Sequence, residues 1–440
     1  MREGELVERP NHYRIDAELG RLGIDVFEIQ EGSRKVFSSG KDVLPETGSR
    51  EAYKTPCFQE VLVLLACDES FRKCEHKLNR VLRRDEKTDA VQSRTIANVV
   101  EREGELIQEH LRTKSERILK SNGFDTDGKP LALEKAFEPP TADAFLPQEM
   151  VCQMIEELNE GKGEEQQIQF VSLHETFENP EKVKANISLD DVCCKKQKAE
   201  GRKKGSPSKA TREMVNNTVA HIQSGASQTY TLNTSNITHM MIVVLAFLLN
   251  NGLLSQPGQV VFFIDGARDL RVAIEHLFGF LSFKIILDWY HLEKKCRELL
   301  SMALNGKQVR NQVLVSLLAR LWLGKVDMAI QFLRDLSENK IKNTKELERL
   351  IGYFERNRNC IPCYALRQRL GLRVSSNPVE KANDLVVSNR QKHNGMSWSA
   401  SGSTSLATVT SVWLNAEQSN WLLNRNINFT FHADTLELVA

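Results

Sequence analysis

Gln259-Val-Val-Phe-Phe-Ile-Asp265-Gly-Ala267 is the stretch that decides the fold. Its five consecutive apolar residues, rich in Val and Phe, are typical of a strand buried on both faces of a sheet. Asp265 ends the run, and a carboxylate there indicates the carboxyl edge of the sheet, where open α/β sheets place their chemistry. Gly266 allows a sharp turn. The stretch therefore predicts an α/β sheet with a functional group at a strand end.

A second strand of the same kind follows. Apolar residues recur at helical spacing after Arg268, and Phe283-Lys-Ile-Ile-Leu-Asp288 is another apolar run that ends on an aspartate. Two parallel strands joined by a helix form a right-handed β-α-β unit. We therefore expect these two strands to be neighbours in one sheet.

The preceding residues predict the rest of this sheet. Residues 183–192 alternate apolar and polar side chains, as a strand with one covered face does, and they include Asp190 and Asp191. Two short strand-like runs and a strongly apolar helix follow, at residues 215–222, 228–232 and 237–250. The resulting order, three strands and then helix, strand, helix, strand, is that of a ribonuclease-H-like domain. In that fold the first and fourth strands are neighbours, so we expect Asp190 and Asp265 to meet.

A third carboxylate comes from a helix much later in the chain. Ser376 or Asn377 is predicted to cap this helix, with a proline at its first position and Glu380 in its first turn. Asp190, Asp265 and Glu380 offer the hard oxygen ligands that Mg²⁺ and Mn²⁺ prefer. Two such ions about 4 Å apart can clamp the attacking and leaving oxygens of an in-line phosphoryl displacement. The three residues are therefore the predicted catalytic and metal-binding groups, for two ions.

Four secondary candidates lie next to these residues or at the start of a predicted helix: Asp191, Asp288, His291 and Asp384. Neighbouring strand residues point to opposite faces, so only one of Asp190 and Asp191 can serve, and we choose Asp190. Asp265 could instead cap the helix that follows it. Asp288 as a helix cap and His291 as the third helical residue fit a structural role better than a direct catalytic one.

Composition indicates a soluble globular protein of two or three domains. The 440 residues are 41% hydrophobic and 27% charged, with a formal net charge of +1. No apolar run is long enough to span a bilayer, and the first residues do not form a signal peptide. The nine cysteines are typical of reduced thiols. We expect a cytoplasmic, nucleoid-associated protein with no membrane partner.

The charge is unevenly distributed, which favours a polyanionic partner. Residues 72–102 hold nine Lys and Arg against five Asp and Glu, and residues 195–209 hold seven against one. Residues 130–189 hold four against twelve. Basic segments of this kind suit nucleic acid, and the acidic segment suits a connector, although solvated surface charge is an alternative for each.

Residues 56–122 predict an all-helical region. A short helix, a turn, a second helix, a turn and a long helix form the outline of a helix-turn-helix unit, which places the start of its last helix in a major groove. Arg94, Thr95 and Asn98 at that start can contact phosphates and base edges. A plain helical bundle is the alternative, and residues 1–50 are expected to be a partly ordered lead-in.

These observations divide the chain into five segments. They are an N-terminal helical DNA-binding region (1–125), an acidic linker with a short helix near 148–158 (126–180), the first part of the catalytic core (181–295), an all-α insertion (296–365), and the rest of the core with the glutamate helix and a C-terminal helix (366–440).

Four motifs point to a family: Asp265-Gly-Ala-Arg268, Leu287-Asp-Trp-Tyr-His-Leu-Glu-Lys-Lys295, Ser375-Ser-Asn-Pro-Val-Glu-Lys-Ala382 and Arg390-Gln-Lys-His-Asn-Gly-Met-Ser-Trp-Ser399. Together they resemble bacterial insertion-sequence transposases of the DDE class, and the nearest likeness is to the Kra- and Lre-type insertion sequences, related to the Mutator-like group. The resemblance covers roughly residues 183–415. The block around Trp398 is its most specific part.

The resemblance implies a ribonuclease-H-like catalytic domain with a helical insertion, and an N-terminal helical DNA-binding region. It makes Asp190, Asp265 and Glu380 the catalytic triad, although Asp191 stands where the family often has glycine. The implied chemistry is Mg²⁺-dependent hydrolysis at transposon ends, followed by attack of the freed 3′-hydroxyl on target DNA. The implied partners are the terminal repeats, the target DNA and further copies of the chain in a homo-oligomer.

Basic and polar side chains are the candidate DNA contacts: Arg94, Thr95, Asn98, Lys195, Lys196, Lys203, Lys204, Arg390, Lys392 and His393. Trp398 either stacks on a base or fills the core, and we favour the core. Two other functions remain open: a structure-selective nuclease on the same fold, and a non-catalytic DNA-binding relative of a transposase.

Overall fold

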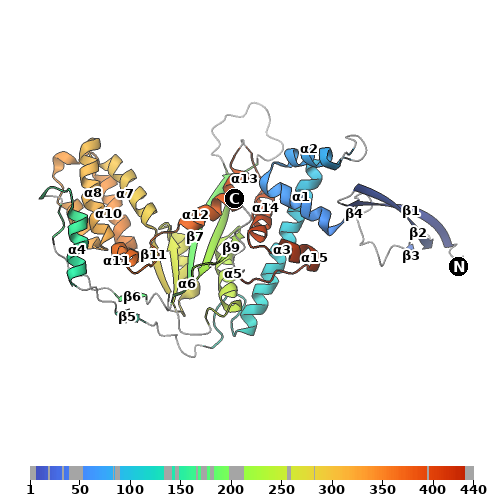
Figure 1. Ribbon diagram of the computed structural model, residues 1–440, viewed down its shortest axis with the longest axis horizontal. Helices are drawn as coiled ribbons and strands as arrows, with labels where there is room; N and C mark the ends of the chain where they lie inside the picture. The colour runs from blue at the N-terminus through green and yellow to red at the C-terminus, as the bar shows by residue number, and fades with distance from the viewer. Residues whose placement is uncertain are drawn as a thin grey trace. The chain divides into compact units, whose positions relative to one another are not determined.

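The structure is a computed structural model that describes most of the chain between residues 6 and 431 (Figure 1). The described ranges are 6–17, 20–31, 34–38, 53–82, 84, 90–132, 141–143, 148–164, 167–169, 176–178, 183–197, 213–254, 259–281, 283–393 and 396–431. Two predicted DNA contacts, Lys203 and Lys204, lie outside them.

The chain forms two compact units, and neither is continuous in sequence. The first unit contains residues 1–111, 193–215 and 385–428, and the second contains 112–192, 216–384 and 429–440. Residues 385–428, predicted as part of the catalytic core, therefore pack with the N-terminal helices. The boundary falls inside the helix that carries Glu380.

Residues 6–38 form strands, where only a partly ordered lead-in to the helical DNA-binding region was predicted. The strands β1 (Leu6–Ala17), β2 (Gly20–Glu31), β3 (Arg34–Ser38) and β4 (Tyr53–Lys54) form one sheet in the order β3-β2-β1-β4. The pairings of β1 with β2 and of β2 with β3 are antiparallel, across connections of two residues. Such tight hairpins can form from polar strands that contain no long apolar run.

The described part of the first unit also contains several helices. They are α1 (Pro56–Asp68), α2 (Phe71–Leu82), the start of α3 (Ser93–Ser121), α13 (Asn389–Gln391), α14 (Ala400–Leu414) and α15 (Gln418–Asn424). Glu103 on α3 is 1% exposed, and Trp421 Nε1 donates to it at 3.0 Å while Arg425 forms an ion pair with it. A buried carboxylate needs such partners. These contacts tie α3 to the C-terminal helix α15.

The second unit contains the predicted sheet. Its strands are β7 (Val183–Lys195, which runs on into the first unit), β8 (Met214–Ser224), β9 (Gln228–Thr234), β10 (Gln259–Ile264) and β11 (Phe283–Leu287), in the order β11-β10-β7-β8-β9. Strand β10 pairs in parallel with both β7 and β11, and β8 forms an antiparallel hairpin with β9. The first and fourth of these strands are thus neighbours, as predicted.

Apolar helices cover this sheet. The helix α5 (Ile237–Asn250) is buried over most of its length, and Phe247 packs against Tyr230 of β9 and against Phe429. The helix α6 (Arg268–Phe278) connects β10 to β11, and its Phe278 packs on Phe262. The β-α-β unit expected around Asp265 is therefore present.

A helical insertion follows β11. Its helices are α7 (Trp289–Ala303), α8 (Lys307–Trp322), α9 (Val326–Arg334), α10 (Thr344–Asn357) and α11 (Tyr364–Arg369). The predicted linker contributes to it, because Val151, Met154 and Ile155 of α4 (Gln148–Asn159) are buried against Leu323 and Leu366. Figure 1 shows α4 beside α8. The linker prediction is therefore wrong for α4, which is part of the core of the insertion. The short strands β5 (Thr141–Asp143) and β6 (Thr176–Glu178) pair with each other.

Candidate active site

The parallel pairing of β7 and β10 places Asp190, which lies inside β7 five residues before its end, beside Asp265, which directly follows β10. Phe263 pairs with Ser188 in the parallel register, so the residue two positions further on each strand is Asp265 and Asp190 respectively. Burial raises the pKa of the Asp190 carboxyl to about 6, and the negative charge of Asp265 adds to this rise. The two carboxylates therefore interact electrostatically, as the sequence predicted for neighbouring strand ends.

Asp190 and Asp191 make contacts in different directions. Asp190 is half-buried, and its Oδ2 accepts a hydrogen bond from Asn383 Nδ2 at 2.6 Å. Asp191 is exposed and accepts from Thr218 Oγ1 on the next strand at 2.6 Å. Since successive strand residues face opposite sides, only Asp190 lies with Asp265 and the glutamate helix.

Asp265 closes a tight turn rather than capping the next helix. Its Oδ1 accepts from Ala267 N at 2.8 Å, and Ala267, the residue before α6, makes no side-chain cap. Gly266 between them has φ +91°, and a Cβ there would lie 2.7 Å from Tyr353 Oη and 2.9 Å from Leu287 Cδ1. The position needs glycine both for its backbone angle and for the close approach of the insertion.

Asp288 is a buried structural centre at the end of β11. It caps α7 by accepting from His291 N at 2.7 Å, and its other oxygen accepts from the Ser376 hydroxyl at 3.0 Å and from the Ser376 amide. Burial alone would raise the pKa of Asp288, but the hydrogen bonds from His291 and Ser376 outweigh it and lower the pKa. The structural role favoured from the sequence is confirmed, with an added tie to the glutamate helix.

Ser376 was one of two residues predicted to cap the glutamate helix with its side chain, and it does not do so. It precedes α12 (Asn377–Asn383) and makes no side-chain cap, because its hydroxyl donates to Asp288. The helix continues as a π-helical turn over Asp384–Ser388 and then as α13. Such turns are frequent at functional sites, and this one follows Glu380 by one turn.

Glu380 projects toward His291 from the first turn of α12. Its Oε1 lies 3.8 Å from His291 Nε2, and its side chain is 53% exposed. Asp384, its rival, is also exposed, and it begins the π-helical turn. The contact with His291 distinguishes the two, because His291 also lies beside Asp265 at a cavity.

His291 lies among all of these carboxylates. Its Nδ1 is 3.1 Å from Asp288 Oδ1, which orients the ring and leaves Nε2 toward Glu380. The hydrogen bond with Asp288 raises the pKa of His291, burial opposes the rise, and the charges of Asp265 and Asp190 add to it. The imidazole therefore responds to the charges of Asp190 and Asp265 and contacts Glu380.

A cavity of about 290 Å³ opens beside Asp265 and His291. Lys294 and Lys295 line it, together with Tyr353 from the insertion. Neither lysine was a candidate from the sequence. Both lie one helical turn beyond His291, at spacings of three and four, which put them on the same helix face. That spacing is the signal that could have identified them.

The donor set fits a divalent cation in its chemistry. Within the described parts of the chain, no three His, Cys, Asp or Glu side chains converge as tightly as bound metal ligands do. The oxygens of Asp190, Asp265 and Glu380 are nevertheless of the hard type that Mg²⁺ takes. The amide oxygen of Asn383 is buried and accepts no hydrogen bond from a described residue, although its nitrogen donates to Asp190. A cation bound there would relieve the repulsion between the carboxylates and give this buried oxygen a partner.

The predicted DNA contacts differ in exposure. At the start of α3, Arg94 and Asn98 are exposed and Thr95 is half-buried. Elsewhere in the first unit the exposed candidates are Lys195, Lys196, Lys392 and His393. Lys196 forms an ion pair with Glu213 at 2.7 Å. Arg390 is 2% exposed and donates from Nε to Ala66 O at 2.8 Å, so it is not the surface contact that was predicted. Trp398 is 7% exposed and donates to Gln391 O at 3.1 Å, in line with the core role favoured for it.

Comparisons with known proteins leave the site geometry as the basis for any assignment. The chain matches no model of a known protein family, and a search of curated protein sequences found no match. Among the helices that the structure describes, none has both the length and the apolar composition needed to cross a membrane.

Proposed function

We propose that this chain is a DDE-type transposase that cleaves DNA at the ends of an insertion sequence and joins them to target DNA. The observation that carries the proposal is the convergence of Asp190, Asp265 and Glu380 on His291, from β7, from the end of β10 and from α12. These groups are far apart in sequence. A carboxylate cluster at adjacent strand ends suits metal-dependent phosphoryl transfer.

The sheet supports the proposal. The order β11-β10-β7-β8-β9, with three parallel strands beside an antiparallel hairpin, is the order expected of a ribonuclease-H-like catalytic domain. The helical insertion between β11 and the glutamate helix also fits the arrangement that the resemblance implies.

Asp190, Asp265 and Glu380 would hold Mg²⁺ or Mn²⁺ in two sites. Bound there, these ions polarise the phosphoryl group and stabilise the attacking and leaving oxygens. Asn383 donates to Asp190 and so favours its ionised form. Asp288 fixes the ring of His291 and the start of α12, which positions Glu380. Lys294 and Lys295 can bind strand phosphates beside the cluster.

Double-stranded DNA is the proposed partner, as the terminal repeats and as the target. The exposed Arg94 and Asn98 at the start of α3 support a DNA-binding role for the helices of the first unit. A homo-oligomer that holds two transposon ends, in the cytoplasm at the nucleoid, completes the proposal.

The test is cleavage of DNA that carries the element's own ends, with Mg²⁺ or Mn²⁺, by wild type and by Glu380→Gln. Asp384→Asn is the matched control, because Asp384 is an exposed carboxylate one turn along the same helix. We expect wild type and Asp384→Asn to cleave and Glu380→Gln not to. Equal cleavage by Glu380→Gln, or no cleavage by folded wild type that still binds the ends, would refute the proposal.

A structure-selective nuclease would use the same carboxylates and differ in the second step. Supplying pre-cut ends with free 3′-hydroxyls and a supercoiled target isolates that step. Joined products identify a transposase, whereas hydrolysis without joining identifies a nuclease.

A further inference from the structure

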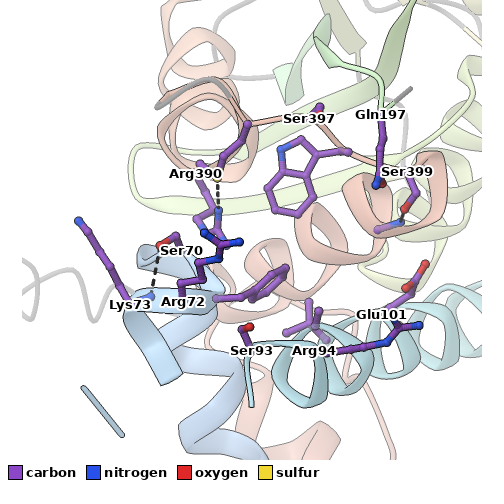
Figure 2. Close-up of a pocket in the computed structure, with 16 residues that line it drawn as sticks. Ser70, Arg72, Lys73, Ser93, Arg94, Glu101, Gln197, Arg390, Ser397 and Ser399 are labelled. Atoms are coloured by element: carbon purple, nitrogen blue, oxygen red, sulfur yellow. Dashed lines mark hydrogen bonds between the residues drawn. The ribbon is translucent and has the colours of Figure 1, made fainter. Parts of the chain in front are cut away.

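The first unit contains a cavity of about 810 Å³, larger than the one beside Asp265 in the second unit, that the proposed chemistry does not use (Figure 2). All of its lining residues belong to that unit. Its volume lies within the range typical of small-molecule pockets. Phe71, Val100, Met396 and Trp398 form apolar parts of its wall. The cavity therefore has room and surface for a planar organic group.

Three helices begin at this cavity. Ser70 precedes α2, Ser93 is the first residue of α3, and Ser399 caps α14 by accepting from Gly402 N at 3.0 Å. Figure 2 shows these serines around the same hollow. Each helix is long enough to carry a partial positive charge at its N-terminus, although one amide at each start already has an acceptor: Lys73 N donates to Ser70 Oγ, Ser93 N to Glu75 Oε2 and Gly402 N to Ser399 Oγ. Three such ends at one cavity favour a negatively charged ligand.

Arg390 supplies an independent sign of an anionic ligand. It is 2% exposed, and its guanidinium lies over the rings of Phe71 at 4.9 Å and Trp398 at 5.1 Å. Nε donates to Ala66 O and Nη1 contacts Met396 Sδ, but no described residue accepts from Nη2. A buried guanidinium nitrogen without an acceptor is costly. Arg390 is one of the residues that line the cavity, so an anion bound there would lie beside this guanidinium.

The rim adds exposed charge. Arg72 and Lys73 on α2 and Arg94 on α3 are exposed cations that line the cavity. One carboxylate, Glu101, also lines it and accepts a hydrogen bond from the Ser401 hydroxyl. The cationic groups outnumber it. A phosphate beside Arg390 and the helix starts, with a base against the apolar wall, would use both halves of the cavity.

We propose that this cavity binds an unpaired nucleotide of a DNA strand. Arg390 and the helix N-termini receive the phosphate, and Phe71 and Trp398 border the base. The inference rests on the proposed function only in taking the nucleic acid to be DNA. It adds a site for a single-stranded segment, which paired bases of a duplex cannot enter.

The test measures binding of the full chain to a fluorescent single-stranded oligonucleotide and to the duplex of the same sequence, in EDTA so that no cleavage occurs. Arg72→Gln is compared with Arg80→Gln, which removes an exposed arginine from the last turn of the same helix. Arg390→Lys tests the centre, with circular dichroism to confirm folding. Thymidine monophosphate and inorganic phosphate are the competitors.

We expect Arg72→Gln to weaken single-strand binding about 5-fold relative to Arg80→Gln, and duplex binding by less than about 2-fold. The monophosphate should compete better than phosphate. Equal single-strand affinities for Arg72→Gln and Arg80→Gln would overturn the proposal, and so would equal competition by phosphate alone. If Arg390→Lys does not fold, Arg72→Gln still decides. If the wild type does not cleave but Arg72→Gln still weakens single-strand binding, the transposase proposal is refuted and the nucleotide site stands. If the wild type cleaves but Arg72→Gln binds single strands as Arg80→Gln does, the nucleotide site is refuted and the transposase proposal stands.

Discussion

The second unit gathers negatively charged side chains at two parallel strands, whereas the first unit gathers positively charged side chains at the starts of three helices. Asp190 lies within β7 and Asp265 directly follows the parallel strand β10, and burial and the charge of Asp265 raise the pKa of Asp190 to about 6. At the cavity, three helices present their N-termini around Arg390. The proposals therefore assign cations to the first site and an anion to the second. The difference shows how one chain can gather like charges in one unit and opposite charges in the other.

The largest expected effect comes from comparing one substitution in each site by both DNA cleavage and strand binding. Asp265→Asn should lower end cleavage by at least about 10³-fold, because it removes a proposed metal ligand, while single-strand binding in EDTA stays within about 2-fold of wild type. Arg72→Gln should reverse this pattern. Cleavage and strand-binding assays on both variants check the contrast, and a fall of both activities in either variant would break it.

Gly266→Ala tests how tightly the insertion packs on the acidic site. The new Cβ would lie 2.7 Å from Tyr353 Oη at a backbone angle that alanine avoids, so we expect a loss of about 3 kcal/mol of unfolding free energy. Adding Tyr353→Phe should recover about 1 kcal/mol by removing the hydroxyl. Gly225→Ala is the control, because it also has positive φ but open space around it. Chemical denaturation provides the values, and equal losses at the two glycines would show that the close approach does not matter.

Asp288→Ala separates the scaffold of the acidic site from its chemistry. It removes the cap of α7 and the acceptor for Ser376, so we expect about 2.5 kcal/mol of destabilisation. Asp288→Ser should keep about 1 kcal/mol of the stability that Asp288→Ala loses, because serine can cap α7 but is too short to accept the hydrogen bond from Ser376. Thermal melting compares the three proteins. A serine variant as stable as wild type would mean that the Ser376 contact contributes nothing.

The raised pKa of Asp190 predicts a pH dependence. Its pKa is about 6 in the folded chain and near 4 unfolded, so its neutral form suits the fold and stability falls as pH rises from about 4 through 6. In EDTA, the free energy of unfolding of Asp190→Asn relative to wild type should therefore rise by about 2 kcal/mol between pH 4 and pH 7. The exposed Asp191→Asn is the control. Denaturation at both pH values checks the gain, and an Asp190→Asn advantage that does not change with pH would contradict it.

The acidic site could be predicted from the sequence because its signals are local. An apolar run that ends on Asp265 marks a strand end by itself, and the strand order then predicts that Asp190 lies beside it. Asn383 was missed, since its role depends on how α12 packs against β7. The hairpins of residues 6–38 were missed, although Leu22, Ile24 and Val26 alternate with other residues as they do in a strand.

The cationic cavity could not be predicted from the sequence because its parts are distant from one another. Ser70 and Arg390 are separated by more than 300 residues, and nothing local to either indicates the other. Arg390 was expected at the surface, because an arginine in a polar motif is usually exposed. Its burial over Phe71 and Trp398 arises only when the C-terminal helices pack with α1 and α2. Pairing of this kind is a property of tertiary structure.

The most direct test of the central claim is to map where a divalent ion binds. Fe²⁺ takes the oxygen ligands of Mg²⁺ sites, and with ascorbate and peroxide it generates hydroxyl radicals that cut the polypeptide nearby. Mass spectrometry then locates the cuts. We predict cuts near Asp190, Asp265 and Glu380, suppressed by excess Mg²⁺ and absent in Asp265→Asn. Cuts elsewhere, or cuts at these places that persist in Asp265→Asn, would contradict the claim that the three carboxylates form one metal-binding site.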